Sequence, residues 1–167
     1  HRAVLDDGTV ITESIAICRY FEALHPDPPL FGRGALEIAR IEMWNRRVEF
    51  EFAQQMSSQF EHLSPFFAGR IEQVPECGAY ARSRILKTLD WLDAELAKRR
   101  YIASDRYTIA DITAQCAVLL GKNTGVPLPA SMHGLQRRRA RLMVSRRCVM
   151  PCPRPRRIAR PTSCLPI

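Results

Sequence analysis

The fold is decided by the stretch Ser104-Asp105-Arg106-Tyr107-Thr108-Ile109-Ala110-Asp111-Ile112-Thr113-Ala114-Gln115-Cys116-Ala117. Thr108 is predicted to be the N-cap of a helix, with its hydroxyl accepting from the N–H of Asp111, while the Asp111 carboxylate reaches back to the N–H of Thr108. The residues after this start, through Leu120, are too apolar for an exposed helix, so the helix is predicted to be buried. Because an unpaired buried N–H costs about 1–3 kcal/mol, the reciprocal cap belongs to the fold.

Length and hydropathy bound the class of protein. The 167 residues suit one domain or a domain and a half, which is long enough for a real core. The sequence holds no apolar run of about 18 residues and no signal-peptide pattern. These features favour a soluble, cytoplasmic protein without membrane contact.

The positive charge is concentrated at one end of the chain. Residues 133–167 hold ten Arg and no Lys, Asp or Glu. Of the 25 basic and 17 acidic residues in the chain, residues 1–132 therefore hold 15 basic and 17 acidic ones, so the body is nearly neutral. The tail has no aromatic residue to stack on bases, and no specific nucleic-acid partner is predicted. Its five prolines predict disorder from about Met150.

Cysteine and histidine usage does not indicate a metal site. The six cysteines form no CxxC pair, and the four histidines are scattered. Zinc sites need these residues clustered at fixed spacing, so no metal is predicted. The cysteines of the body are interpreted as small buried hydrophobes in a reducing compartment.

The first part of the chain predicts a hairpin followed by a helix. Residues 3–11 predict a β-hairpin in which Asp7-Gly8 forms a two-residue type I′ turn. The helix that follows is predicted to run through Leu24, and the residues expected to face inward are Ile15, Cys18, Phe21 and Leu24. Three prolines between residues 26 and 29 end it, and residues 25–34 are predicted to be an extended linker at a domain boundary.

Three further helices are predicted. Apolar spacings of three and four begin at Ala35 and continue to Leu63, which predicts a helix of about seven turns. A second helix is predicted over residues 80–98, after breakers at Ser64-Pro65 and Val74-Pro75. The third, over residues 108–120, is the capped helix, with its end predicted at Gly121.

The order of these features resembles a known family. Asp7-Gly8-Thr9, Thr12-Glu13-Ser14-Ile15-Ala16-Ile17, Tyr20, Leu24, Pro26 and Leu30-Phe31-Gly32 are similar to the second half of the thioredoxin-like domain of cytosolic glutathione S-transferases, the bacterial type above all. Tyr107-Thr108-Ile109-Ala110-Asp111-Ile112 resembles the capping box of that family's all-helical C-terminal domain. Each piece alone is common, but their order and spacing are specific.

The resemblance implies a fold and its division into parts. Residues 1–28 would be an α+β remnant of the thioredoxin-like, glutathione-binding domain, a β-hairpin plus a helix. Residues 29–132 would be the all-α glutathione S-transferase C-terminal domain, and residues 133–167 a disordered basic tail.

The resemblance also implies a function. Glutathione would be the co-substrate, conjugated to an apolar electrophile bound between the domains, in a chain that could form a homodimer. Glu13 and Ser14 match the motif that holds the γ-glutamyl end of glutathione. A helix start with free N–H groups suits the glutamyl carboxylate, and the Glu13 carboxylate can accept from the ammonium group. The alternative is that Thr12, Glu13 and Ser14 only cap the helix.

The chain departs from the family pattern at both ends. The family's first β-α-β unit, which carries the thiol-activating Ser, Tyr or Cys, has no counterpart here, so no catalytic residue is assigned and impaired activity is expected. No proline precedes Pro26, so the family's cis-proline is also unmatched. The Arg- and Pro-rich composition of residues 133–167 suggests the hypothesis that they are an out-of-frame product of a GC-rich gene.

Three functions therefore remain open from the sequence. The first is a glutathione transferase-like protein that lacks its activating group. The second is a non-catalytic helical interaction module of the same fold. The third is a nucleic-acid or membrane-surface binder acting through the arginines of residues 133–167.

Overall fold

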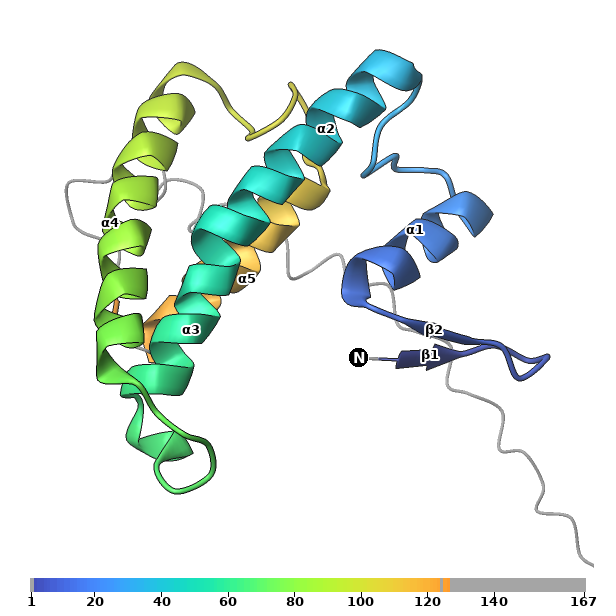
Figure 1. Cartoon of the computed structure of the whole chain (residues 1–167). Helices are drawn as coiled ribbons and strands as arrows, with labels where there is room; N and C mark the ends of the chain where they lie inside the picture. Colours follow the sequence, from blue (N-terminus) through green and yellow to red (C-terminus); the bar gives the residue numbers. More distant parts are fainter. Residues whose placement is uncertain (1, 124, 127–167) are drawn as a thin grey trace, which may run out of the picture.

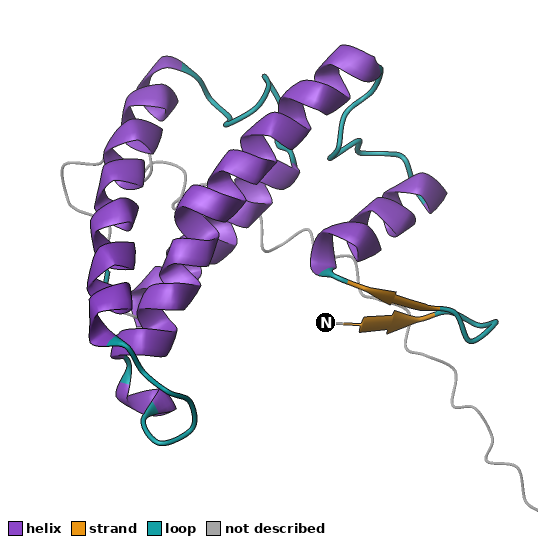
Figure 2. Cartoon of the chain, in the orientation of Figure 1, coloured by secondary structure: helices purple, strands orange, loops and turns teal. Residues whose placement is uncertain are grey.

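The computed structural model of the chain describes residues 2–123 and 125–126. A two-stranded hairpin and one helix lie beside a group of longer helices (Figures 1 and 2). The elements in chain order are β1 (Arg2–Val4), β2 (Val10–Thr12), α1 (Ser14–Leu24), α2 (Ala35–Val48), η1 (Glu49–Ala53), α3 (Gln54–Leu63), η2 (Pro65–Phe67), α4 (Pro75–Lys98) and α5 (Ile109–Asn123). The disordered tail and the out-of-frame origin predicted for residues 133–167 lie outside the described residues.

The hairpin forms as predicted, but its turn differs. Strand β1 pairs antiparallel with β2 in the register Arg2↔Thr12, Ala3↔Ile11 and Val4↔Val10. The Gly8 N–H donates to the Leu5 carbonyl at 3.0 Å, and the Leu5 N–H donates to the Thr9 carbonyl at 2.9 Å. Gly8 has φ +85°, whereas Glu13 is the only described non-glycine residue with a positive φ. The predicted two-residue type I′ turn is therefore wrong, because Asp7 does not take the left-handed conformation that it requires; the loop is the longer type with glycine at the bulge.

Helix α1 has the predicted end but not the predicted buried face. No residue of α1 is fully buried. Cys18 is exposed, and Phe21 and Leu24 are 49% and 55% exposed, so the expectation that these three face inward is wrong. The Asp27–Pro28 peptide bond in the linker that follows is cis.

The face of α1 that meets the helical part is largely polar. It carries Ile15, Arg19 and Glu22, which follow one another at helical spacings of four and three. Ile15 packs against a buried apolar cluster. Arg19 pairs with Glu42 of α2 and lies 4.4 Å over the Phe31 ring. Charged side chains therefore form much of the contact between α1 and the helical part, where apolar side chains were expected.

Residues 35–63 form the continuous helix that the apolar spacing predicts, with one irregular turn. The π-helical turn η1 inserts between α2 and α3 without ending the helix, since the residues on both sides keep helical backbone angles. The Thr88 hydroxyl of α4 donates to the Glu51 carbonyl at 3.0 Å, and the Gln55 side-chain amide donates to the Phe50 carbonyl at 3.1 Å. These side chains supply partners to carbonyls of the wider turn.

Helices α4 and α5 are both longer than predicted. Helix α4 begins at Pro75 rather than at residue 80, because a proline in the first turn gives up no helical hydrogen bond. Helix α5 continues past Gly121 to Asn123. A Cβ at Gly121 would lie 3.0 Å from both Met56 Cε and the Val126 carbonyl oxygen, so the glycine permits close packing there rather than ending the helix.

The helix start predicted from residues 104–117 is confirmed for the Asp111 carboxylate, but the role predicted for the Thr108 hydroxyl is wrong, because this hydroxyl donates to the carboxylate and the Asp111 N–H goes to the Thr108 carbonyl instead. Asp111 Oδ2 accepts from the N–H and from the hydroxyl of Thr108, both at 3.0 Å. Asp111 Oδ1 accepts from the Ile102 N–H at 3.0 Å, and the Asp111 N–H reaches the Thr108 carbonyl at 3.1 Å. Thr108 and Asp111 are 0% and 2% exposed. The buried carboxylate therefore joins the start of α5 to the segment that follows α4.

The main core lies between the long helices. Its buried members are Trp44, Val48, Phe52, Met56, Ile85, Leu89, Leu92, Leu96, Ile102, Ala110, Ala114, Ala117 and Val126. A smaller cluster of Phe31, Ile41 and Ile109 lies where the linker meets α2 and α5. The apolar interior therefore belongs mostly to the helical part, as an all-α domain requires.

The cysteines differ from their prediction. Cys18, Cys77 and Cys116 are exposed free thiols, so the interpretation as buried hydrophobes is wrong for the cysteines in the described residues. In that same part of the chain, no group of three or more His, Cys, Asp or Glu side chains could hold a metal ion. No helix among the residues described is both long enough and apolar enough to span a membrane.

Candidate functional site

The two predicted site residues, Glu13 and Ser14, lie where β2 leads into α1, and both are exposed. The Ile17 N–H donates to the Glu13 carbonyl at 3.0 Å, so Glu13 is the N-cap residue of α1, and its side chain makes no capping hydrogen bond. Glu13 therefore caps α1 through its backbone carbonyl alone, and the alternative of a side-chain cap does not hold for this residue. The N–H groups of the first turn, at the positive end of the helix dipole, stay available beside the Ser14 hydroxyl.

Glu13 has a strained backbone. Its φ of 67° and ψ of 124° lie in a region that favours glycine. Such a conformation costs about 1–3 kcal/mol and persists where the surrounding structure imposes it, often at ligand-binding sites. Here Thr12 ends the strand and Ser14 begins the helix, so the change of direction falls on the single residue between them.

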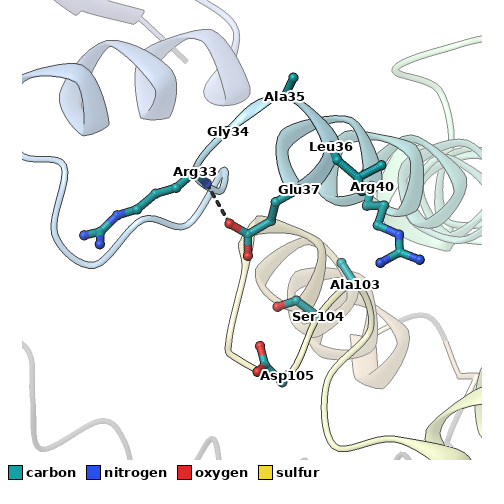
Figure 3. Close-up of a pocket in the computed structure, with 9 residues that line it drawn as sticks. All are labelled: Arg33, Gly34, Ala35, Leu36, Glu37, Arg40, Ala103, Ser104 and Asp105. Atoms are coloured by element: carbon teal, nitrogen blue, oxygen red, sulfur yellow. Dashed lines mark hydrogen bonds between the residues drawn. The ribbon is translucent and has the colours of Figure 1, made fainter.

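A pocket of about 570 Å³ lies elsewhere, between the start of α2 and the loop before α5 (Figure 3). The residues that line it are Arg33, Gly34, Ala35, Leu36, Glu37, Arg40, Ala103, Ser104 and Asp105. The Glu37 carboxylate accepts from the Arg33 N–H at 2.7 Å, as Figure 3 shows, and pairs with Arg106 at 2.6 Å. Glu37 thereby ties the linker, α2 and the loop before α5 together. Neither Glu13 nor Ser14 lines this pocket.

Glu37 should make stability depend on pH. The hydrogen bond from Arg106, followed by that from the Arg33 N–H, holds the pKa of Glu37 below its ordinary value of 4.5. A carboxyl group whose pKa is lower in the folded state stabilises the fold above the unfolded-state pKa and stops doing so as the pH falls through the folded-state pKa. The stability advantage of the wild type over Glu37→Gln should therefore be greatest near neutral pH and shrink below 4.5.

Urea unfolding of both proteins at a series of pH values measures this difference. The amide of Glu37→Gln cannot titrate, so only the wild type has this contribution to lose. An advantage that stayed constant from about pH 7 to about pH 3 would contradict the role given to the ionised Glu37 carboxylate.

Comparison with known proteins identifies the family to which this fold belongs. The family model of the glutathione S-transferase C-terminal domain matches residues 42–118. Glutathione S-transferase 2 of Saccharomyces cerevisiae is 34% identical over 134 residues, which are 79% of this chain and 58% of that protein. The crystal structure of Gtt2 from the same yeast superposes with a TM-score of 0.80 at 31% identity, covering 85% of this chain and 69% of that one. The chain therefore belongs to the glutathione S-transferase family.

A second kind of relative matches much the same region. Elongation factor 1-gamma of Prunus avium is 32% identical over 115 residues, which are 69% of this chain and 26% of that protein. The chain thus spans a little over half of the yeast transferase and about a quarter of the elongation factor. The chain is thus similar both to a transferase and to an elongation factor subunit, and neither similarity alone assigns an activity.

Sequence reasoning missed the polar groups that join α1 to the rest of the molecule. Hydropathy alone favours the apolar residues of the same helix over Arg19 and Glu22. Their spacing from Ile15, four and seven residues, could have placed all three on one face. Their partners, Glu42 of α2 and the backbone of Leu30 and Phe31, are brought to them by the tertiary fold, and no sequence pattern indicates these pairings.

Proposed function

We propose that this chain binds glutathione at the start of α1 through Glu13 and Ser14, and that it serves the conjugation of glutathione to apolar electrophiles. The uncapped first turn of α1, entered through the strained Glu13, carries this proposal. The N-cap position is held by Glu13, whose side chain makes no hydrogen bond to the N–H groups of the first turn. A ligand carboxylate would satisfy those groups.

The chemistry follows from glutathione itself. The α-carboxylate of its γ-glutamyl end would accept from the Ser14 hydroxyl and from N–H groups of the first turn, where the helix dipole favours negative charge. The α-ammonium group would donate to the Glu13 carboxylate, which is exposed beside it. Thiol activation is assigned to no residue of this chain.

The family relationship supports the remaining parts of the proposal. We assign residues 1–28 to glutathione binding and residues 29–132 to the helical domain that would border the electrophile. The protein is proposed to act in the cytoplasm, with a homodimer as its assembly.

Ser14→Ala tests the site directly. Charge-assisted hydrogen bonds contribute about 1.5–3 kcal/mol, so the variant should bind glutathione at least about tenfold more weakly. Isothermal titration calorimetry measures the affinity, with the dipeptide cysteinylglycine as a probe that lacks the γ-glutamyl end and should not bind. Ser83→Ala is the matched control, since Ser83 is an exposed α4 residue bonded to the Tyr80 carbonyl.

The outcomes separate the two functional hypotheses. Binding by the wild type and by Ser83→Ala, with loss in Ser14→Ala, supports the proposal. A wild type that does not bind glutathione contradicts it and favours the second candidate, a non-catalytic interaction module. The similarity to a relative named as an elongation factor rather than a transferase is what favours that candidate.

A further inference from the structure

The linker after α1 turns back and binds the helix it has just left. The Glu22 carboxylate of α1 accepts from the Leu30 N–H at 2.8 Å and from the Phe31 N–H at 2.9 Å. Glu22 is half-buried, and two backbone N–H groups on one carboxylate are charge-assisted bonds of good length. Residues 30–31 are therefore fixed to α1 through one side chain.

The other side of the same two residues is fixed to the helical part. The Leu30 carbonyl accepts from the N–H of Ile109, the first residue of α5, at 3.1 Å. The Phe31 side chain is 5% exposed and lies in a cluster with Ile41 and Ile109, against which Ile15 also packs. The linker thus lies between α1 and the helical part and bonds to both.

Together with the pairing of Arg19 with Glu42, this arrangement holds α1 at three points. Near the start of α1, Ile15 packs on the cluster that contains Phe31. Seven residues further along, Glu22 bonds to the backbone of Phe31 itself. Because Ser14 directly precedes Ile15, the direction in which the first turn of α1 points is set by these attachments. Loss of the Glu22 attachment would remove the bond between α1 and the linker, and the partly exposed Arg19–Glu42 pair would have to hold that part of the helix.

We propose that Glu22 is a positioning residue for glutathione binding, which acts through Leu30, Phe31 and Ile15 to hold Ser14 in place. The role rests on the proposed function, because it concerns the same site. Glu22 lies eight residues from Ser14, about 12 Å along the helix axis, so it does not touch a ligand held at the first turn. Its influence passes through the linker.

The test is a double-mutant cycle between Glu22→Gln and Ser14→Ala, read as glutathione affinity by calorimetry. Glutamine offers one acceptor oxygen in place of two, so one of the two linker N–H groups loses its partner. We expect Glu22→Gln alone to weaken binding by about tenfold, and to weaken it much less in a chain that already carries Ser14→Ala. Such non-additivity is the mark of a residue that acts through Ser14.

Two further variants make the result specific. Asp27→Asn removes a carboxylate from the same region whose pairing with Arg33, at 3.2 Å, is largely exposed, and it should leave the affinity unchanged. Glu22→Asp keeps the charge on a shorter side chain and should bind with intermediate affinity. It also provides the measurement if Glu22→Gln does not fold.

Each outcome has one meaning. An affinity unchanged in Glu22→Gln, or an equal loss with and without Ser14→Ala, overturns the positioning role and leaves Glu22 a structural residue. A wild type that does not bind glutathione overturns the proposed function itself. Wild-type binding that is sensitive to Ser14→Ala but not to Glu22→Gln overturns only the positioning role.

Discussion

Replacement of Asp111 by alanine should lower the free energy of unfolding by about 3–5 kcal/mol. The Asp111 carboxylate is 2% exposed and accepts three hydrogen bonds, from the N–H and hydroxyl of Thr108 and from the N–H of Ile102. Alanine leaves these donors buried without that acceptor, and each such group costs about 1–3 kcal/mol. The effect should be large because one carboxylate bonds both to Thr108 at the start of α5 and to Ile102 in the segment before it.

Equilibrium unfolding in urea, followed by circular dichroism, measures this loss. Asp105→Ala is the control, because Asp105 is an exposed aspartate six residues earlier in the same segment, and it should change stability by less than about 0.5 kcal/mol. A loss below about 1 kcal/mol in Asp111→Ala would show that water or other groups satisfy the donors, and the buried Asp111 carboxylate would not be the essential feature of the fold.

Phe52→Ala should be comparably destabilising, by about 3–5 kcal/mol, because it removes a large side chain from a close-packed core. Phe52 is 0% exposed and lies in the core with Val48, Ile85 and Leu89. It belongs to the π-helical turn η1 and lies four residues from the buried Val48 and Met56 on either side.

Phe50→Ala provides a control of identical chemistry. Phe50 lies two residues earlier in the same turn and is 46% exposed, so its loss should cost less than about 1 kcal/mol. Thermal and urea unfolding of the two variants side by side give the difference. Equal losses would mean that the turn does not separate the two phenylalanines into an inner and an outer one.

The sequence was informative where structure depends on neighbours along the chain. The start of α5 could be predicted because Thr108 and Asp111 are three residues apart, within reach of each other in any first helical turn. The same reasoning found the apolar stripes of the helices and the hairpin. The predicted start of α4 was five residues too late, because Pro75 was interpreted as a helix breaker, although proline also suits the first turn of a helix.

Prediction was poorer wherever distant segments decide the outcome. Hydropathy predicts Ile15, Cys18, Phe21 and Leu24 as the buried face of α1. Of these four, Ile15 packs inward, and the helix turns Arg19 and Glu22 toward partners in α2 and the linker. The site residues Glu13 and Ser14 were identified through a resemblance. Their uncapped, strained backbone geometry became visible only in the structure.

By itself the sequence determined the hairpin, the long helices, their order and the bond from the Thr108 N–H to Asp111, because hydrogen bonds over three or four residues and apolar periodicity need no knowledge of the rest of the chain. Only the tertiary structure decided the π-helical turn in the long helix, the face on which α1 docks, and the attachment of the linker by Glu22. These depend on contacts between segments far apart in sequence, whose free energies are settled by packing and desolvation in the assembled fold rather than by local preference.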